Sequence, residues 1–411
     1  MGLTQITIGY VPLLDSAVLI AAQEQGFAEN EGLFLKRVRE TSWANIRDRV
    51  AIGHFDAAHM LGPMPLSANL GLTPLDTPLI APMALGLGGN AITVSNDLWA
   101  AMAEAGAPQD GSAQETGKAL FSVIAQRAGA GLPRLRFGVV HRESGHNYEL
   151  RYWLAASGID PDRDIEIVVV PPPFQPDALA ARRTDGYIVG EPFGSVAVAR
   201  GIGRIITTKS AIWRLSPEKV LGTRVQWAER YPEQLAALVR AVTRAARWCG
   251  DPDNLPRLAA MLSGEDRLQQ SAELLMRPLS GHLLFGPDNE RRIDDFYVPF
   301  RHAANFPWVS HAMWFYSQMV RWGQVEHSAE NAAKARASYR PDIYRAALAG
   351  QAIAVPAANA KVEGALHEPM MVGAIGGSLT LGPDGFFDGT QFDPDRLDEY
   401  ILNQTASPLK D

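Results

Sequence analysis

Two residues stand where an α/β fold presents its binding edge. His146 follows Ser144 and Gly145 at an expected helix start, just after a strand that ends at Val140. Free backbone N–H groups and the positive end of the helix dipole meet at such a position and suit an anion. The alternative is a histidine that only caps the helix or lies exposed on its first turn.

Trp43 occupies the equivalent place on an earlier helix, where it follows Ser42, a suitable N-cap residue. In open α/β folds ligands bind at the carboxyl ends of strands, where a tryptophan forms a wall or donates its indole N–H. The alternative is core packing, which is the usual fate of a tryptophan and which the residues by themselves favour.

Two further positions carry weaker signals. Prolines 171–173 follow an apolar strand and fix a rigid exit from the sheet, which a simple turn also explains. Lys219 is expected near a helix start, where the dipole does not favour a cation. Its position indicates a specific role, with surface exposure as the alternative.

Several other chemistries lack their motifs in this sequence. It has no phosphate loop or GxGxxG, no CxxC or HExxH, and no G-x-S-x-G. His54 and His59 flank an expected strand that points them to opposite faces, so they make a weak metal pair. The single cysteine, Cys249, lies on an apolar helical stripe, which favours a packed thiol over a nucleophile.

Composition sets broader limits. The chain has 411 residues with 38 Lys and Arg, 45 Asp and Glu and a net charge of −7. This length indicates two or three units with their own cores. An acidic balance without a basic run argues against a nucleic-acid groove or an anionic membrane as direct partner.

Strand-like and helix-like runs alternate twice, which predicts two α/β lobes with parallel, doubly wound sheets. The first round has strands 6–13, 33–38 and 55–60, with helices 16–25 and 43–52 between them. The second has strands 135–140, 165–170 and 186–189 and a helix over 146–156. Beyond residue 201 helices dominate, including an aromatic layer over 296–322, and the segment 386–395 is expected to be a strap that docks its phenylalanines.

The first residues lead directly into a strand, without a visible signal peptide. No apolar run approaches the roughly 20 residues that span a bilayer. We therefore expect a cytoplasmic protein, although a chain whose leader had been removed would look the same.

Motifs along nearly the whole chain resemble the nitrate/bicarbonate-binding protein family. They are Ile8–Ala17, Ser42–Asp48, Ala57–Pro65, Arg151–Pro161, Val170–Pro173, Asp185–Pro192, Pro217–Gly222 and Phe387–Pro394. The resemblance implies a type II periplasmic-binding-protein-like clamshell, with the ligand between two lobes. We assign residues 1–92 and 205–411 to lobe I and residues 93–204 to lobe II.

The resemblance also implies a ligand set: Trp43, Asn90, His146, Pro172 and Lys219. Asn90 departs from the family pattern, because a glutamine with a longer arm is usual there. Lys219 is the discriminating position, since bicarbonate-binding relatives are acidic there and use a metal ion. Neither a metal nor another cofactor is expected for this chain.

Nitrate is a planar monoanion with acceptor oxygens and no donor, so its site should offer donors and one balancing cation. Nitrite would satisfy much of the same set. Without a leader, the chain is similar to the cytoplasmic nitrate/nitrite sensor of this family, the NasS type. That similarity implies a non-enzymatic protein that releases a two-domain RNA-binding antiterminator, the NasT type, when the anion binds.

Two alternatives remain. The first is a periplasmic nitrate/nitrite receptor of an ABC transporter with its leader absent. The second is an enzyme on the same clamshell, such as the pyrimidine-forming thiamin-pathway proteins. Their cysteine-rich motif is missing from a chain with one cysteine.

Overall fold

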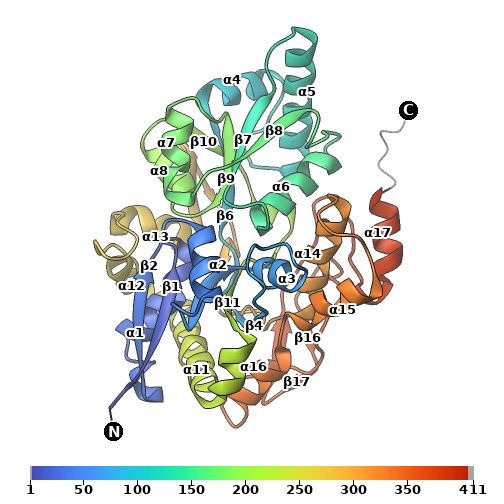
Figure 1. Ribbon diagram of the computed structural model, residues 1–411. Helices are drawn as coiled ribbons and strands as arrows, with labels where there is room; N and C mark the ends of the chain where they lie inside the picture. Colours follow the sequence, from blue (N-terminus) through green and yellow to red (C-terminus); the bar gives the residue numbers. More distant parts are fainter. Residues whose placement is uncertain (1, 406–411) are drawn as a thin grey trace.

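Two five-stranded sheets, one in each lobe, form the framework of the molecule (Figure 1). The computed structural model describes residues 2–405. In lobe I the strand order is β2 (Leu33–Arg39), β1 (Thr4–Tyr10), β3 (Ala57–Leu61), β11 (Lys219–Arg224) and β4 (Leu79–Ala84). In lobe II it is β10 (Gly203–Thr208), β6 (Asn90–Ser95), β9 (Gly186–Gly190), β7 (Leu135–Val139) and β8 (Ile165–Val169).

Both sheets are mixed, whereas the sequence pattern predicted parallel ones. β1 pairs in parallel with β2 and β3, but β11 runs antiparallel to β3 and β4. In lobe II, β7 is parallel to β8 and β9, and β6 is antiparallel to β9 and β10. β6 and β11 each enter from the other lobe. They therefore start at the edge where the parallel strands of their sheet end.

The chain passes between the lobes after β4 and again between β10 and β11. Residue pairs 92/93 and 204/205, the predicted boundaries, fall inside β6 and β10, so the sheets assign 90–208 to lobe II. At the first crossing Gly88 has φ +71°, and a Cβ there would lie 2.3 Å from the carbonyl oxygen of Phe296. Only glycine fits this close approach.

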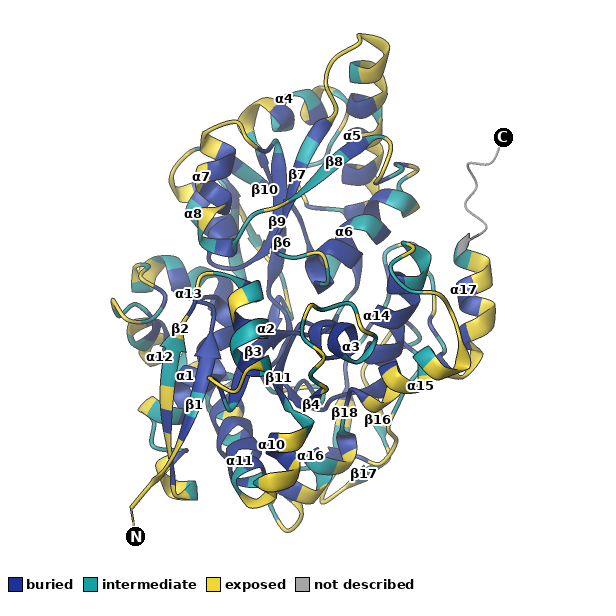
Figure 2. Ribbon diagram, viewed as in Figure 1, coloured by how far each residue is buried: buried dark blue, intermediate teal, exposed yellow. Residues whose placement is uncertain are grey.

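Helices cover the sheets of both lobes, with their exposed residues outward (Figure 2). In lobe I they are α1 (Ala17–Glu24), α2 (Trp43–Ala51), α3 (Met64–Asn69), α10 (Val225–Arg230), α11 (Pro232–Cys249), α12 (Leu255–Leu262) and α13 (Ala272–Ser280). In and beside lobe II they are α4 (Asn96–Glu104), α5 (Ala113–Gly129), α6 (Gly145–Ala156), α7 (Gln175–Ala180), α8 (Phe193–Ala199) and α9 (Lys209–Ile212).

Several other elements are short. Small two-stranded pairs are formed by β5 (Leu87–Gly88) with β14 (Tyr297–Val298), β12 (His282–Gly286) with β13 (Asn289–Arg292), β15 (Val355–Pro356) with β17 (Ala374–Ile375), and β16 (Met370–Val372) with β18 (Leu379–Leu381). Single 3₁₀ turns are η1 (Leu14–Ser16), η2 (Glu29–Glu31), η3 (Pro172–Phe174), η4 (Pro252–Asn254) and η5 (Pro394–Arg396).

The apolar stripe along α11 faces the core as predicted, and Cys249 at its end is buried. Burial also raises the pKa of this thiol. No helix within residues 2–405 is long and apolar enough to cross a membrane.

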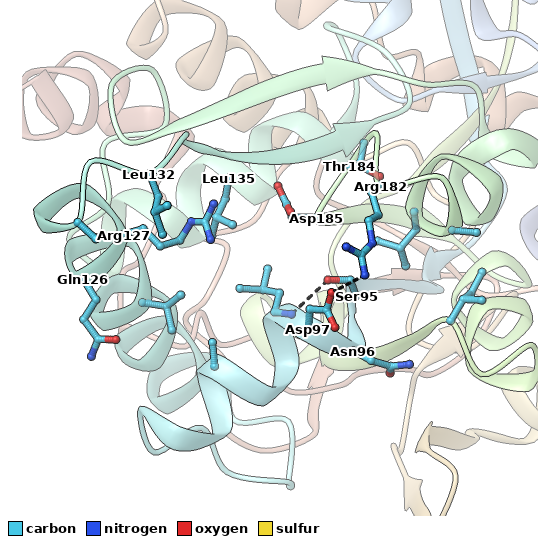
Figure 3. A pocket seen from close by; sticks show the side chains of 17 residues that line it. Ser95, Asn96, Asp97, Gln126, Arg127, Leu132, Leu135, Arg182, Thr184 and Asp185 are labelled. Atoms are coloured by element: carbon cyan, nitrogen blue, oxygen red, sulfur yellow. Dashed lines mark hydrogen bonds and ion pairs between the residues drawn. The ribbon is translucent and has the colours of Figure 1, made fainter.

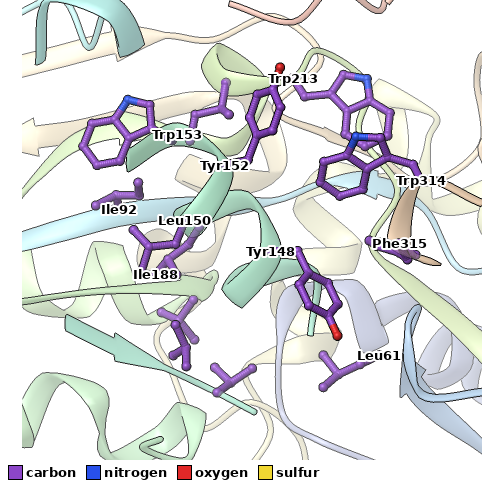
Figure 4. Packing of buried hydrophobic residues seen from close by; sticks show 14 of the residues in the cluster. Leu61, Ile92, Tyr148, Leu150, Tyr152, Trp153, Ile188, Trp213, Trp314 and Phe315 are labelled. Carbon is purple, nitrogen blue, oxygen red and sulfur yellow. The ribbon is translucent and has the colours of Figure 1, made fainter. Parts of the chain in front are cut away.

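The C-terminal region consists of α14 (Val309–Arg321), α15 (Ala329–Ala337), α16 (Pro341–Leu348) and α17 (Leu397–Thr405). Helices α15 and α16 pack on lobe I, and α14 contacts α6 of lobe II. The predicted aromatic layer is confirmed, because α14 is buried over residues 309–319. The predicted strap also docks: Phe386 stacks on Trp213 with ring centroids 4.4 Å apart. Tyr152 of α6 packs in the same aromatic group (Figure 4). The strap therefore contacts an element of lobe II directly.

Candidate functional site

The strand ends that face the other lobe carry the predicted site residues. In lobe I, Lys219 begins β11 opposite Leu61, the last residue of β3. In lobe II, Asn90 begins β6 opposite Gly190, the last residue of β9. Both antiparallel strands thus start where parallel neighbours end, which is the edge at which α/β folds bind ligands.

Lys219 is a strand residue, so the expectation of a helix start was wrong. Its Nζ atom is fully buried, 2.9 Å from Asp15 Oδ2 and in contact with the Glu218 carboxylate. Burial alone would lower the pKa of Lys219, but Asp15 and Glu218 raise it above its ordinary value. The side chain is therefore a fixed cation.

Trp43 is the first residue of α2, where the Ser42 hydroxyl accepts the Ala44 N–H and caps the helix. The indole is buried, with Lys219 Nζ 5.3 Å from its ring centroid and the His59 ring 5.1 Å away. Its Nε1 atom has no hydrogen-bond partner. The Trp43 ring thus forms a wall of the site, and its indole N–H is available to donate to a ligand.

His146 lies in the first turn of α6, which Ser144 caps by accepting the Asn147 N–H. The imidazole is fully buried and neither ring nitrogen has a hydrogen-bond partner. Nε2 lies 3.6 Å from Glu218 Oε1. Burial lowers the pKa of His146 to about 3, so the ring is neutral at pH 7 and has one N–H to donate.

Asn90 is also fully buried, and its Nδ2 atom donates to Glu218 Oε2 at 2.8 Å. Pro172 differs from the other four predicted residues. It begins η3 after β8, and its carbonyl accepts the Gln175 N–H of the same turn. Among residues 2–405, no hydrogen bond or ion pair links Pro172 to the other four.

The structure adds residues that the sequence did not single out. Lys209, the first residue of α9, is fully buried and contacts the Glu218 carboxylate. Its Nζ atom also donates to the Pro217 carbonyl at 2.5 Å and lies 3.0 Å from Glu149 Oε1. The predicted single cation is therefore wrong, because two lysines and several carboxylates share the site. We call Asp15, Trp43, His59, Asn90, His146, Lys209, Glu218 and Lys219 the cleft cluster.

The ionised groups of the cleft cluster balance. Burial alone would raise the pKa of Asp15, but Lys219 and His59 lower it to about 2. Burial has the same effect on Glu218, yet Lys209 and Lys219 hold its pKa well below the ordinary value. Glu149 is a further carboxyl group beside Lys209, and burial raises its pKa to about 8. At pH 7, two lysines face two carboxylates, while Glu149 is mostly protonated.

The sequence indicated His59 only as a weak metal ligand. In the structure, β3 places its ring in the cleft cluster. Its Nε2 atom lies 2.9 Å from Asp15 Oδ1, and burial lowers the pKa of its ring. In the described part of the chain, no three His, Cys, Asp or Glu residues are grouped to hold a metal ion.

Some of the added residues had a signal in the sequence. Asp15 and Glu218 both lie inside motifs that carried the family resemblance, and Glu218 directly precedes Lys219. Lys209 had no such signal, because only the packing of α9 against α6 and β6 brings it to the cluster.

A separate cavity of about 650 Å³ lies at the outer end of lobe II (Figure 3). Apolar side chains and the pair Arg182 and Asp97, 3.2 Å apart, line it with Arg127. None of its lining residues belongs to the cleft cluster.

Two α/β lobes with a buried polar cluster at their facing strand ends define the clamshell fold of solute-binding proteins. Residues 2–263 match the NMT1-like family. The chain is 31% identical to the nitrate/nitrite binding protein NrtA of Synechococcus elongatus over 407 residues, or 96% of this chain and 85% of that protein. It is also 34% identical over 353 residues to the nitrate import ATP-binding protein NrtC of Synechocystis, covering 84% of this chain but only 50% of NrtC.

The crystal structure of the periplasmic nitrate-binding protein NrtA from Synechocystis PCC 6803 has the same fold. Its TM-score is 0.84 at 25% identity, with 98% of both chains covered. The chain thus belongs to the NMT1-like family and, within it, to the nitrate/bicarbonate-binding proteins.

Proposed function

We propose that this protein binds nitrate or nitrite between its lobes and serves as a sensor, without catalysis. One observation carries the proposal: Trp43, Asn90, His146 and Lys219 meet in the cleft cluster of a chain 31% identical to a nitrate/nitrite binding protein. The anion is the ligand for which such a donor set is suited.

The donors match the chemistry of these anions. Nitrate and nitrite only accept hydrogen bonds, and the cluster supplies an indole N–H, a carboxamide, an imidazole N–H and two ammonium groups. Two of these donors, Trp43 Nε1 and the His146 ring, have no hydrogen-bond partner in the protein. Buried donors without partners cost free energy, so a ligand that pairs them is favoured.

Signalling follows from the two lobes. An anion that binds between them favours one arrangement of the lobes, and a partner that prefers the other arrangement is then released. By linkage each ligand weakens the other by the same factor. The cytoplasmic location and the partner, a two-domain RNA-binding antiterminator, rest on the resemblance to the NasS-type sensor.

A periplasmic receptor of an ABC transporter is the second candidate, because NrtA of Synechocystis is a periplasmic nitrate-binding protein with this fold. Fractionation of cells that express the full gene separates the two candidates.

A pull-down tests the proposed partner. A cell lysate passed over the immobilised protein with and without nitrate is expected to yield a partner only without nitrate.

Isothermal titration calorimetry with nitrate, nitrite, bicarbonate and sulfate tests the ligand. We expect saturable binding of nitrate or nitrite and none of sulfate, because Asp15 and Glu218 already face the two lysines and a dianion brings one more negative charge than nitrate does. Failure to bind either nitrogen oxyanion contradicts the proposed function, and tighter binding of bicarbonate would reassign it.

A further inference from the structure

The side chain of Glu218 joins the two lobes. Its residue directly precedes β11 of lobe I, and its backbone carbonyl accepts the Gly62 N–H at 3.0 Å. Its carboxylate reaches across to lobe II, where it accepts from Asn90 Nδ2 at 2.8 Å, and it also contacts Lys209, which directly follows β10 of that lobe. The same carboxylate contacts Lys219 of lobe I. One acidic group therefore bridges the site.

This carboxylate uses the donors that the proposed ligand needs. Asn90 and Lys219 bond to it directly, and His146 Nε2 lies 3.6 Å from its Oε1 atom. A carboxylate resembles nitrate and nitrite, since all three are planar groups with negatively charged acceptor oxygens. The donors cannot serve both anions at once.

The balance of charges in the cleft cluster also disfavours a second anion beside Glu218. Lys209 and Lys219 are balanced by Asp15 and Glu218, so the buried site has no spare positive charge. A second anion beside Glu218 would leave a buried negative charge without a partner, which is costly. His146 does not supply that charge, because its buried ring is neutral.

We propose that Glu218 is a tethered counter-anion, which holds the lobes together in the ligand-free protein and which nitrate or nitrite must displace. The identity of the displacing anion rests on the proposed function, whereas the bridge is a property of the chain itself. Displacement makes binding an exchange of anions. The apparent affinity is then reduced by the fraction of molecules in which the donors are already occupied.

Glu218→Gln tests the exchange, because it removes the negative charge and keeps the shape. We expect this variant to bind nitrate at least tenfold more tightly than the wild type in calorimetry at pH 7. The matched control is Glu149→Gln. Glu149 is another buried carboxyl group that lies 3.0 Å from Lys209 but has no hydrogen bond or ion pair to Asn90 or Lys219. Its substitution is expected to change the affinity less than threefold.

The bridge is tested without any ligand by the distance between the lobes. Spin labels are attached to cysteines introduced at Ile52 in lobe I and Phe121 in lobe II, which are 57% and 45% exposed, while buried Cys249 stays unlabelled. We expect one narrow distance in the wild type and a broader, longer distribution in Glu218→Gln. Nitrate should restore the narrow distance.

Equal or weaker nitrate binding by folded Glu218→Gln, with an unchanged distance distribution, overturns the proposal. If that variant does not fold, Glu218→Asp, whose shorter arm cannot span the site, is expected to show the same shifts in smaller size. A wild-type protein that binds neither nitrate nor nitrite would contradict the proposed function alone. The ligand-free distances would still decide whether Glu218 bridges the lobes.

Discussion

The Nζ atom of Lys219 lies 2.9 Å from Oδ2 of Asp15, and both groups are buried. The lysine that the sequence assigned to the anion is thus already half of an ion pair. Substitutions here must therefore separate the contribution to folding from the contribution to binding.

We predict that Lys219→Met lowers both the unfolding free energy of the protein and its affinity for nitrate. Leaving Asp15 buried without its cation should cost about 3–5 kcal/mol of unfolding free energy. A hydrogen bond to a charged group contributes about 1.5–3 kcal/mol, so nitrate affinity should fall about 10- to 100-fold. The double variant Lys219→Met with Asp15→Asn should regain much of the stability in urea but not the affinity. Nitrate binding that survives the single change would remove Lys219 from the site.

Asp15 should make the protein sensitive to acid. Its pKa is lowered to about 2 in the fold, below its ordinary value, so its contribution is full above about pH 4 and is lost as pH falls towards 2. The contribution is about 2 kcal/mol. Urea unfolding at pH 6 and pH 2 measures it: the difference between wild type and Asp15→Asn should shrink by about that amount. A constant difference would show that Asp15 has no lowered pKa.

Trp43→Phe isolates one donor. The ring that packs beside Lys219 and His59 is largely kept, and the Nε1 atom, which has no partner in the protein, is removed. Stability should change by less than about 1 kcal/mol, because no hydrogen bond is lost on folding. Nitrate affinity should fall about 3- to 10-fold, which corresponds to one hydrogen bond of about 1 kcal/mol. An unchanged affinity would show that Trp43 only packs in the site and does not donate a hydrogen bond to nitrate.

The ring of His146 should remain neutral well below pH 6, because burial lowers its pKa to about 3. The unfolded chain takes up this proton near pH 6.5, so stability decreases as pH falls from 6.5 towards 3. Nuclear magnetic resonance of histidine rings in the wild type and His146→Gln identifies the signal. It should not shift between pH 8 and pH 5, with free imidazole as the reference. A shift near pH 6.5 would place His146 in contact with water.

Tyr152 links α6, the helix that carries His146, to the C-terminal strap. Its hydroxyl donates to both Asp388 carboxylate oxygens, at 2.9 and 2.8 Å, while its ring packs on Phe386 and Trp314. Tyr152→Phe should lower the unfolding free energy by about 1 kcal/mol, because only the hydrogen bond is lost and water can solvate its acceptor, the exposed Asp388. Tyr152→Ala should cost about 3–5 kcal/mol through the cavity it leaves. Thermal and urea unfolding distinguish these outcomes, and equal losses would show that the hydrogen bond is what matters.

Local rules were enough for much of the framework. Alternating apolar runs predicted β1, β2, β7 and β8 within a few residues, and serine caps fixed the starts of α2 and α6. These features depend on neighbours in sequence, so the sequence alone determines them. The sequence alone does not determine the boundaries of the lobes, because the residues of an apolar strand such as β6 do not specify which sheet the strand joins.

The same distinction applies to the site. The sequence determined which residues this protein carries at the positions of the family's ligand set: Trp43, Asn90 in place of the usual glutamine, His146 and Lys219. Only the tertiary structure decided that Lys219 shares its burial with Glu218 and that Lys209 lies against the same carboxylate. The physical reason is that burial and charge pairing act between residues far apart in sequence. The charge that one lysine offers to a ligand is set by the carboxylates that folding brings beside it.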